Sequence, residues 1–247
     1  MNIIDSKLNW GGALAKRSKI DMIVLHHAAA QNCTIYNIHQ WHLANGWSGC
    51  GYHYLIRKDG RIFKGRPDDT IGSHAKGCNS TSLGICFEGD FEKEMPIQAQ
   101  IDAGIELVKH LKEKYNIQKV KGHGQLMQTS CPGKLFPMEQ FLGEKENLIL
   151  SFQRAVVADG IKLKQYGCDG KYGAETAKAM KQCVVKKRLF YKYKNATQLV
   201  QRLLNVKQDG LCGSVTTKAI KEFQKNKKLI VDGAVGEQTW KALLGID

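Results

Sequence analysis

The chain of 247 residues lacks any run of 18 consecutive apolar residues, so the sequence predicts no membrane-spanning helix and no membrane partner. Residues 1–18 contain no basic stretch followed by an apolar one, and we therefore expect no secretory signal peptide and accumulation in the cytoplasm. No CxxC pair occurs among the eight cysteines. In a chain without a signal peptide, this pattern favours free thiols over a disulfide framework.

Familiar catalytic motifs are missing as well. The sequence contains no HExxH, no GxSxG and no Walker loop, so three large classes of hydrolase are not indicated. The composition, 43% hydrophobic and 24% charged, is ordinary for a soluble globular protein, and the length allows one or two domains. Any chemistry must therefore come from residues that are dispersed along the chain.

Charge and histidine are unevenly distributed. Residues 151–247 hold 19 lysines and arginines against 8 acidic residues, a net charge of +11, whereas residues 1–150 hold 18 against 15, a net charge of +3. All eight histidines lie in the first part. We therefore expect chemistry in the first part, and in the second part binding of a polyanion, either nucleic acid or an anionic cell wall.

The first part mixes strand and helix signals. Apolar runs at 20–30 and 82–91 indicate buried strands, and two β-prone runs around an Asp-Gly pair at 51–66 indicate a hairpin. Helices are expected at 34–45 and after Pro96, where apolar residues recur every three or four positions. The predicted fold class is α/β, a mixed sheet flanked by helices.

The second part is repetitive. The pattern D-G-x-x-G-x-x-T begins at Asp169, Asp209 and Asp232, and each copy continues as T-x-K-A. We expect the Asp-Gly pair to form a tight turn, the second glycine to take a left-handed conformation, and the threonine to mark a helix start. This predicts a smaller, mainly α-helical repeat domain at 149–247 after a catalytic domain at 1–148.

Two places in the first domain offer metal-ligating side chains. His26 or His27 ends the apolar run at 20–30, and the segment GHGQLMQTSCPG sets His123 eight residues before Cys131. Zinc accepts imidazole nitrogen and thiolate, and a catalytic zinc site uses three protein ligands with one open position. His26, His123 and Cys131 would form such a set. Strand alternation leaves the choice between His26 and His27 open, because both faces of this run are apolar.

Residues 20–133 resemble the zinc amidase family shared by amidase-type phage lysozymes and the peptidoglycan recognition proteins of animals. The stretches IVLHHAAA, QWHLANGWSGCGYHYLIRKDG, IGSHAKGCNSTSLGI and GHGQLMQTSCPG carry the resemblance, in the family's order. It implies that His26, His123 and Cys131 hold one Zn²⁺ per chain and that Tyr52 is the active-site tyrosine. The implied reaction is hydrolysis, by zinc-activated water, of the amide bond between N-acetylmuramic acid and L-alanine in bacterial peptidoglycan.

Three further positions are interpreted through this resemblance. Phage lysozymes of this type often carry a lysine where this chain has Thr129. Catalytically active recognition proteins have a threonine there, so Thr129 is expected to help Tyr52 stabilise the charged intermediate. His74, in GSHAKG, matches a position that lines the substrate groove, and either a substrate-binding or a structural role is open. Cys86 stands where recycling amidases have glutamate, so the general base is open, with Glu88 as one alternative.

The second domain resembles the helical peptidoglycan-binding domain family, over residues 197–244, and 151–190 looks like a less complete copy. Its positive charge suits a wall that carries teichoic-acid phosphates or peptide carboxylates. The expected partner is therefore bacterial peptidoglycan, in a Gram-positive wall. A phage or prophage endolysin that reaches the wall after release at lysis fits these features better than a secreted autolysin.

Two other functions compete with this interpretation. A non-catalytic recognition protein would be favoured by loss of the cysteine ligand, but Cys131 is present together with Tyr52 and Thr129. A nucleic-acid-binding protein is suggested by the net charge alone, and no aromatic-interleaved basic motif supports it, so no nucleic-acid partner is expected. Nothing in the sequence indicates an oligomeric state.

Overall fold

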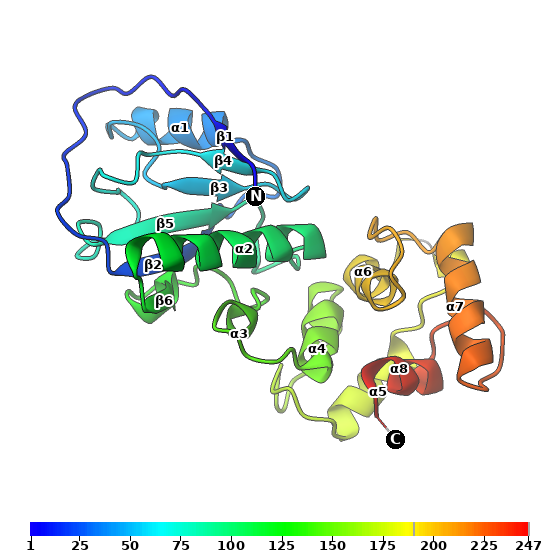
Figure 1. Ribbon diagram of the computed structural model, residues 1–247. Coiled ribbons are helices and arrows are strands. Elements are labelled where there is room, and N and C mark those ends of the chain that lie inside the picture. The colour runs from blue at the N-terminus through cyan, green and yellow to red at the C-terminus, as the bar shows by residue number, and fades with distance from the viewer. Residues whose placement is uncertain (190, 247) are drawn as a thin grey trace. The chain divides into compact units, whose positions relative to one another are not determined.

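A computed structural model describes residues 1–189 and 191–246, which form two compact units, Met1–Lys145 and Glu146–Asp247 (Figure 1). The predicted boundary between residues 148 and 149 falls just inside the second unit. Among the described residues, none of the helices combines the length and apolar character that crossing a membrane requires. No disulfide joins the cysteines of the described residues.

The first unit is built on one six-stranded mixed sheet. Its strands are β1 (Ile3–Asp5), β2 (Met22–His27), β3 (Tyr54–Ile56), β4 (Ile62–Lys64), β5 (Ser82–Phe87) and β6 (Lys119–Gly122), and their spatial order is β1-β4-β3-β5-β2-β6. Only β3 and β4, the predicted hairpin, pair antiparallel; the other neighbours are parallel. Every residue of β2 and β5 is buried, as their continuous apolar runs predicted.

Helices cover both faces of this sheet, which confirms the predicted fold class (Figure 1). The helices of this unit are α1 (Ile35–Ala44), α2 (Gln98–Tyr115), the 3-10 turn η1 (His123–Gln125) and the short α3 (Met138–Phe141). Ile35 and Ile38 of α1 pack against Cys86 on one face. Gly104 of α2 lies against the ring of Phe87, which points to the other face. Successive residues of β5 thus serve different layers.

The second unit consists of helices, as predicted for the repeats. They are α4 (Leu148–Ala158), α5 (Ala174–Gln182), the 3-10 turn η2 (Lys187–Leu189), α6 (Lys194–Leu203), α7 (Ser214–Asn226) and α8 (Glu237–Leu244). Its core includes the fully buried Trp240 of α8, whose ring contacts Phe152 of α4 at 4.8 Å between centroids. The Trp240 indole also donates a hydrogen bond to the Cys183 carbonyl.

Each of the three D-G-x-x-G-x-x-T motifs is held by a buried glutamine from the preceding helix. In the second motif, the Gln201 side-chain amide donates to Asp209 Oδ1 at 2.7 Å, to the Leu211 carbonyl and to Thr216 Oγ1, and the Gly210 amide donates back to Gln201. Gln153 and Gln224 make the corresponding bonds in the first and third motifs. We call this arrangement the glutamine clamp.

The clamp corrects two expectations about the motif. The first glycine takes the left-handed conformation, with φ of 72°, 75° and 74° at Gly170, Gly210 and Gly233, whereas the second glycine is the N-cap of the following helix. The threonine lies inside the first helical turn rather than at the cap, because its hydroxyl is bound by the clamp glutamine.

Candidate metal centre

The sheet brings the predicted ligands together at the carboxyl end of β2. His26 is the last residue but one of β2, and Leu25 pairs with Gly122 of the neighbouring β6. His123, the next residue along the chain, therefore emerges beside His26. The loop after η1 then returns Cys131, whose carbonyl accepts a hydrogen bond from the Gly124 amide at 2.6 Å.

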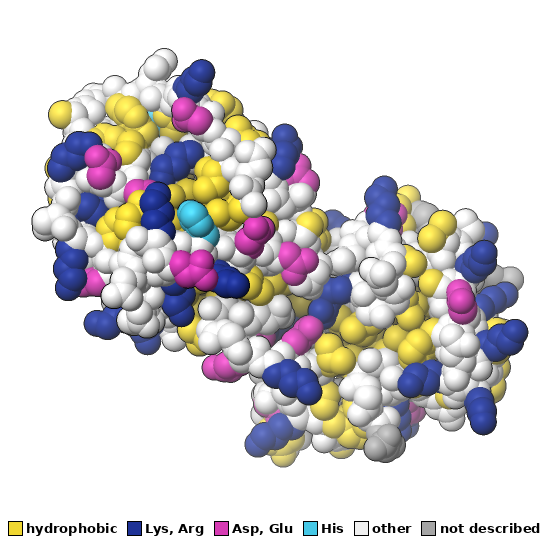
Figure 2. Space-filling view, viewed as in Figure 1, with side chains coloured by type: hydrophobic (Ala, Val, Ile, Leu, Met, Phe, Trp, Pro, Cys, Tyr) yellow, Lys and Arg dark blue, Asp and Glu magenta, His cyan; other side chains and the backbone are white. Residues whose placement is uncertain are grey.

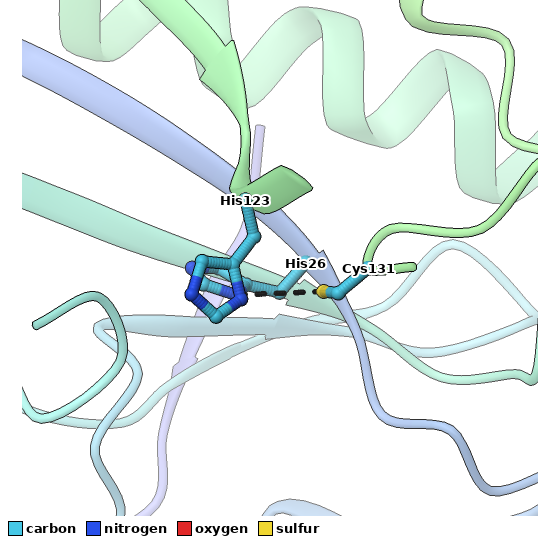
Figure 3. Close-up of side chains that lie close together, drawn as sticks. All are labelled: His26, His123 and Cys131. Atoms are coloured by element: carbon cyan, nitrogen blue, oxygen red, sulfur yellow. Dashed lines mark hydrogen bonds between the residues drawn. The ribbon is translucent and has the colours of Figure 1, made fainter. Parts of the chain in front are cut away.

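The three side chains point toward one common place (Figure 3). One ligand atom from each lies within 4.8 Å of the others, and in the described part of the chain this is the only such group of three. His26 Nδ1 lies 3.6 Å from Cys131 Sγ, and the rings of His26 and His123 are 4.5 Å apart between centroids. Tetrahedral zinc, with bonds of about 2.0–2.3 Å, needs ligand atoms about 3.3–3.8 Å apart, so small side-chain adjustments would suffice.

His27 is turned away from this group. Its Nδ1 accepts a hydrogen bond from the Phe91 amide at 3.1 Å, on the face of the sheet opposite to His26. The backbone amide of His27, however, lies 3.4 Å from Cys131 Sγ and donates to it. Of the two histidines that the sequence left open, His26 is the one whose ring lies in the group, and His27 contributes a backbone donor to the thiol.

Burial keeps the metal-free group uncharged. Burial, together with the neighbouring His74 and His123 rings, lowers the pKa of His26 well below its ordinary value, and burial also lowers the pKa of His123. Burial raises the pKa of the Cys131 thiol to about 11. Two neutral imidazoles and a thiol that can ionise form the donor set that a divalent cation requires, so the residues present fit zinc.

Tyr52 lies against the same group. Its ring is 5.1 Å from the His26 ring between centroids, and burial raises its pKa well above the ordinary value, so the phenol stays protonated. Gly51 allows the chain to pass here, because a Cβ at this position would lie 2.0 Å from the Ser73 carbonyl oxygen. Thr129 is exposed, and its hydroxyl accepts a hydrogen bond from the Cys131 amide at 3.3 Å.

His74 is buried behind His26 rather than exposed on a groove. A hydrogen bond of 3.0 Å joins His74 Nδ1 to His26 Nε2, and His74 Nε2 lies 3.4 Å from the Ser82 carbonyl. Gly84 gives the ring its place, since a Cβ there would lie 2.6 Å from His74 Cγ. Its substrate contact stays a prediction, while its contact with His26 is direct.

Glu88 is bound on several sides. Its carboxylate accepts hydrogen bonds from Arg57 Nε at 2.5 Å and from the backbone amides of Lys58 and Cys33. Although burial opposes ionisation, these bonds lower the pKa of Glu88, so the carboxylate is charged and fixed. A group held in this way is a poor candidate for the general base.

Sequence reasoning missed two neighbours of the group. Met127 Sδ lies 3.1 Å from His123 Nε2, and the His42 ring lies 5.6 Å from the Tyr52 ring between centroids. His42 Nδ1 accepts a hydrogen bond from the Gly51 amide, which links α1 to the segment that carries Tyr52. Met127 lies four residues after His123, so its contact is local, whereas the fold brings His42 to Tyr52 from a separate element.

At the end of a central strand, two imidazoles and a thiol lie beside a protonated tyrosine. This arrangement places the protein in the class of metal-assisted hydrolases as a candidate. Comparison with known proteins narrows this class. Residues 16–134 match the N-acetylmuramoyl-L-alanine amidase family, and residues 193–243 match the peptidoglycan binding domain family.

Individual relatives agree with these matches. The endolysin of Klebsiella phage KP32 is 35% identical over 144 residues, which cover 55% of this chain and 93% of the relative. Peptidoglycan-recognition protein 2 of Holotrichia diomphalia is 33% identical over 149 residues, covering 53% of this chain and 80% of that protein. The solved structure of the N-acetylmuramoyl-L-alanine amidase LysC from Clostridium intestinale superposes with a TM-score of 0.57 at 40% identity, over 59% of this chain and 99% of LysC.

The chain belongs to the N-acetylmuramoyl-L-alanine amidase family and carries a C-terminal peptidoglycan-binding domain. It is an enzyme that hydrolyses the amide bond between N-acetylmuramic acid and L-alanine in peptidoglycan.

Proposed function

We propose that this amidase holds one zinc ion per chain through His26, His123 and Cys131. The observation that carries the proposal is the convergence of their ligand atoms within 4.8 Å at the end of β2. When bound there, zinc would polarise the scissile carbonyl and lower the pKa of a water molecule toward about 7. The His27 amide, which donates to Cys131 Sγ at 3.4 Å, would stabilise the thiolate form of that ligand.

Tyr52 and Thr129 are proposed as the catalytic side chains. The protonated Tyr52 phenol beside His26 supplies a donor for the carbonyl oxygen that gains negative charge as the amide is attacked. Thr129, exposed next to Cys131, supplies a second hydroxyl on the open side of the group. Neither role needs a charged side chain.

His74 is proposed to position His26. If His26 uses Nδ1 as the ligand, its Nε2 carries the proton and donates it to His74 Nδ1, which fixes the tautomer. A His74 side chain that instead contacts the substrate would give a different result on substitution. His74→Ala should lower zinc affinity if His74 positions the ligand, and should raise KM at unchanged zinc affinity if it contacts substrate.

The second unit is proposed to hold the enzyme on its substrate, which gives a catalytic domain at 1–148 and a wall-binding domain at 149–247. Its net positive charge and its family match support this division. We further propose that the enzyme acts on the wall after release at lysis, as the endolysin relatives suggest. The relatives come from both a Klebsiella phage and a Clostridium, so a Gram-positive target stays a prediction that rests on charge.

Digestion of purified walls tests the reaction. Walls from a Gram-positive and a Gram-negative species are incubated with the enzyme, and released amino groups and reducing sugar ends are measured separately. New alanine amino termini without new reducing ends are expected, and faster release from the Gram-positive wall would support that target. New reducing ends would identify a glycosidase and overturn the proposal. No release at all would leave the rival, a non-catalytic recognition protein.

A further inference from the structure

The three repeats of the second unit can be aligned on the motif that the glutamine clamp fixes. The first repeat contains α4, the motif at 169–176 and α5. The second contains α6, the motif at 209–216 and α7, and the third contains α7, the motif at 232–239 and α8. The clamp glutamines and threonines are buried and bound to the motif, which leaves the other positions of the repeat as candidates for ligand contacts.

Two of the repeats form a cleft with the same four positions of their second helix. These positions are one before the motif threonine and two, three and six after it. In the first repeat, a cleft of about 540 Å³ is lined by Glu175, Lys178, Ala179 and Gln182. In the third, a cleft of about 370 Å³ is lined by Gln238, Lys241, Ala242 and Gly245. The opposite wall comes in each case from the turn that ends the preceding helix.

The first cleft combines positive charge with an apolar surface. Lys162, Lys164 and Lys178 are exposed around it, while Ile161 and Ala179 line it as buried residues. Its one carboxylate, Glu175, accepts hydrogen bonds from the backbone amides of Gln165 and Tyr166 at 3.1 Å. The cleft therefore has three ammonium groups around it and one carboxylate, which is already hydrogen-bonded, so its net charge is positive. Figure 2 shows many lysine and arginine side chains, and few acidic ones, over the visible surface of this unit.

The other two repeats differ from the first in informative ways. In the third, Lys241 forms an ion pair with Glu237 at 3.4 Å, which reduces the charge available to a ligand. In the second, the corresponding positions carry the exposed Val215 and, six residues after the threonine, Glu222. That carboxylate would repel an anion, although Lys218 keeps the lysine of the pattern.

We propose that the cleft between the end of α4 and α5 binds the stem peptide of peptidoglycan through its carboxylates, with Lys162 and Lys178 as the main contacts. The cleft beside α8 is a second, weaker subsite of the same kind. The first cleft lies outside residues 193–243, the part that matches the peptidoglycan binding domain family. The inference rests on the proposed function in one respect, that peptidoglycan is the ligand of this unit.

The surface of the cleft favours a peptide over a phosphodiester polymer. Ile161 and Ala179 line the cleft and offer apolar contacts to small aliphatic side chains such as alanine, which a polyol phosphate does not provide. The lysines offer charge-assisted hydrogen bonds to free carboxylates. Two similar clefts on one unit also suit a polymer that presents the same peptide repeatedly, because a second contact raises the apparent affinity.

The test uses the full-length protein and a synthetic stem pentapeptide, L-Ala-D-Glu-L-Lys-D-Ala-D-Ala. It lacks the sugar–peptide bond and is not cleaved by the amidase. Calorimetric titration is done with wild type, Lys178→Glu, the neutral Lys178→Gln, and Lys218→Glu as the matched control at the same position of the second repeat. Lys178→Glu is expected to weaken binding about tenfold and Lys178→Gln less, with Lys218→Glu unchanged. A pentapeptide with an amidated C-terminus should bind wild type more weakly.

The same variants are sedimented with walls, before and after acid removal of phosphodiester polymers. The proposal expects the difference between Lys178→Glu and Lys218→Glu to survive on stripped walls. Equal effects of the two variants would mean unspecific charge attraction and would overturn the proposed binding site. Absence of any effect in both variants would overturn it as well. A difference that disappears on stripped walls would assign the cleft to wall phosphate instead. Release of alanine amino termini by wild type is scored separately, so failure of the cleft and failure of the amidase are distinguishable.

Discussion

In the first unit, Met1–Lys145, buried histidine rings face one another at the end of a strand, whereas in the second unit, Glu146–Asp247, buried glutamines face the backbone. The two ring nitrogens of His26 lie near side-chain atoms, the His74 ring and the Cys131 sulfur. The clamp glutamine Gln201 instead fixes a turn: it binds the Gly210 amide and the Leu211 carbonyl of the backbone, as well as the side chains of Asp209 and Thr216. Buried polar groups that satisfy the backbone build the fold, and those that face only each other can serve chemistry.

The same criterion separates the histidines within the first unit. His39 Nδ1 accepts from the Cys50 amide and its Nε2 lies 2.9 Å from the Asn9 carbonyl. His53 is likewise bound at both nitrogens, by the Gly84 amide and the Thr70 carbonyl. Both rings are therefore structural, and His26 differs from them although all three are buried.

The largest effect is expected from removing the thiol. Cys131→Ser should lose most of the zinc and slow wall cleavage by at least about 10³-fold, beyond the 10–100-fold that loss of an orienting neighbour costs. Sedimentation with walls should persist, because the proposed wall-binding residues lie in the other unit. Metal analysis, amino-group release and sedimentation measure the three outcomes.

Cys168→Ser is the matched control in the second unit, where the thiol is half-buried and far along the chain from the metal group. It should keep zinc, cleavage and wall binding. Full zinc and full activity in Cys131→Ser would remove Cys131 from the site and break the contrast between the units.

Tyr52→Phe should have the next largest effect. Loss of a hydroxyl that donates to a developing oxyanion is expected to lower kcat by about 10²–10³-fold. Zinc content should not change, since the phenol is not a ligand. Turnover of a soluble muramyl peptide, with metal analysis of the same sample, provides the measurement. Tyr36→Phe, on an exposed tyrosine of α1, is the control and should retain wild-type turnover; a Tyr52→Phe enzyme as fast as this control would exclude the donor role.

The glutamine clamp predicts a loss of stability confined to the second unit. Gln201→Ala leaves the buried Gly210 amide without its acceptor, while the Thr216 hydroxyl keeps its bond to the Leu211 carbonyl, so a cost of about 1–3 kcal/mol is expected. Amide hydrogen exchange should therefore accelerate in α6 and α7 and stay unchanged in β2. Gln198→Ala, on the same helix but outside the clamp, should cost about 0.5 kcal/mol or less. Equal exchange in the two variants would mean that the clamp does not stabilise the repeat.

Much of the fold could be predicted because its central elements have strong local signals. The all-apolar runs of β2 and β5 and the Asp-Gly hairpin were found from pattern alone. The edge strands β1 and β6 were not, since a run of three or four residues is too short to show a pattern of its own. They form by pairing with β4 and β2, which only the tertiary fold provides.

The site illustrates the same limit. Resemblance named His26, His123 and Cys131, but hydrophobic periodicity could not choose between His26 and His27, because every residue of β2 is buried and neither face of the strand is polar. The clamp was missed for a related reason. Gln201 and Gln224 precede their motif by 8 residues and Gln153 by 16, so the repeat of the glutamine is not visible as a fixed spacing.

The smallest predicted effect is a dependence of zinc affinity on pH. Between pH 7 and 9 the metal-free His26 and His123 are neutral, because their pKa values are lowered, while Cys131, with a pKa of about 11, still carries its proton. Binding as a thiolate therefore releases one proton, and the association constant should rise about tenfold for each pH unit in this window. Chelator competition at a series of pH values measures the slope.

Cys131→Asp provides the control for this slope. A carboxylate ligand is already ionised above about pH 5, so the variant should bind zinc more weakly but with an affinity that is nearly flat from pH 7 to 9. The second unit contributes nothing to either curve, since it contains no histidine and its cysteines lie outside the metal group. If the zinc affinity of the wild type did not change between pH 7 and 9, Cys131 would not lose a proton when zinc binds. The ligand set would then have to be sought elsewhere in the first unit.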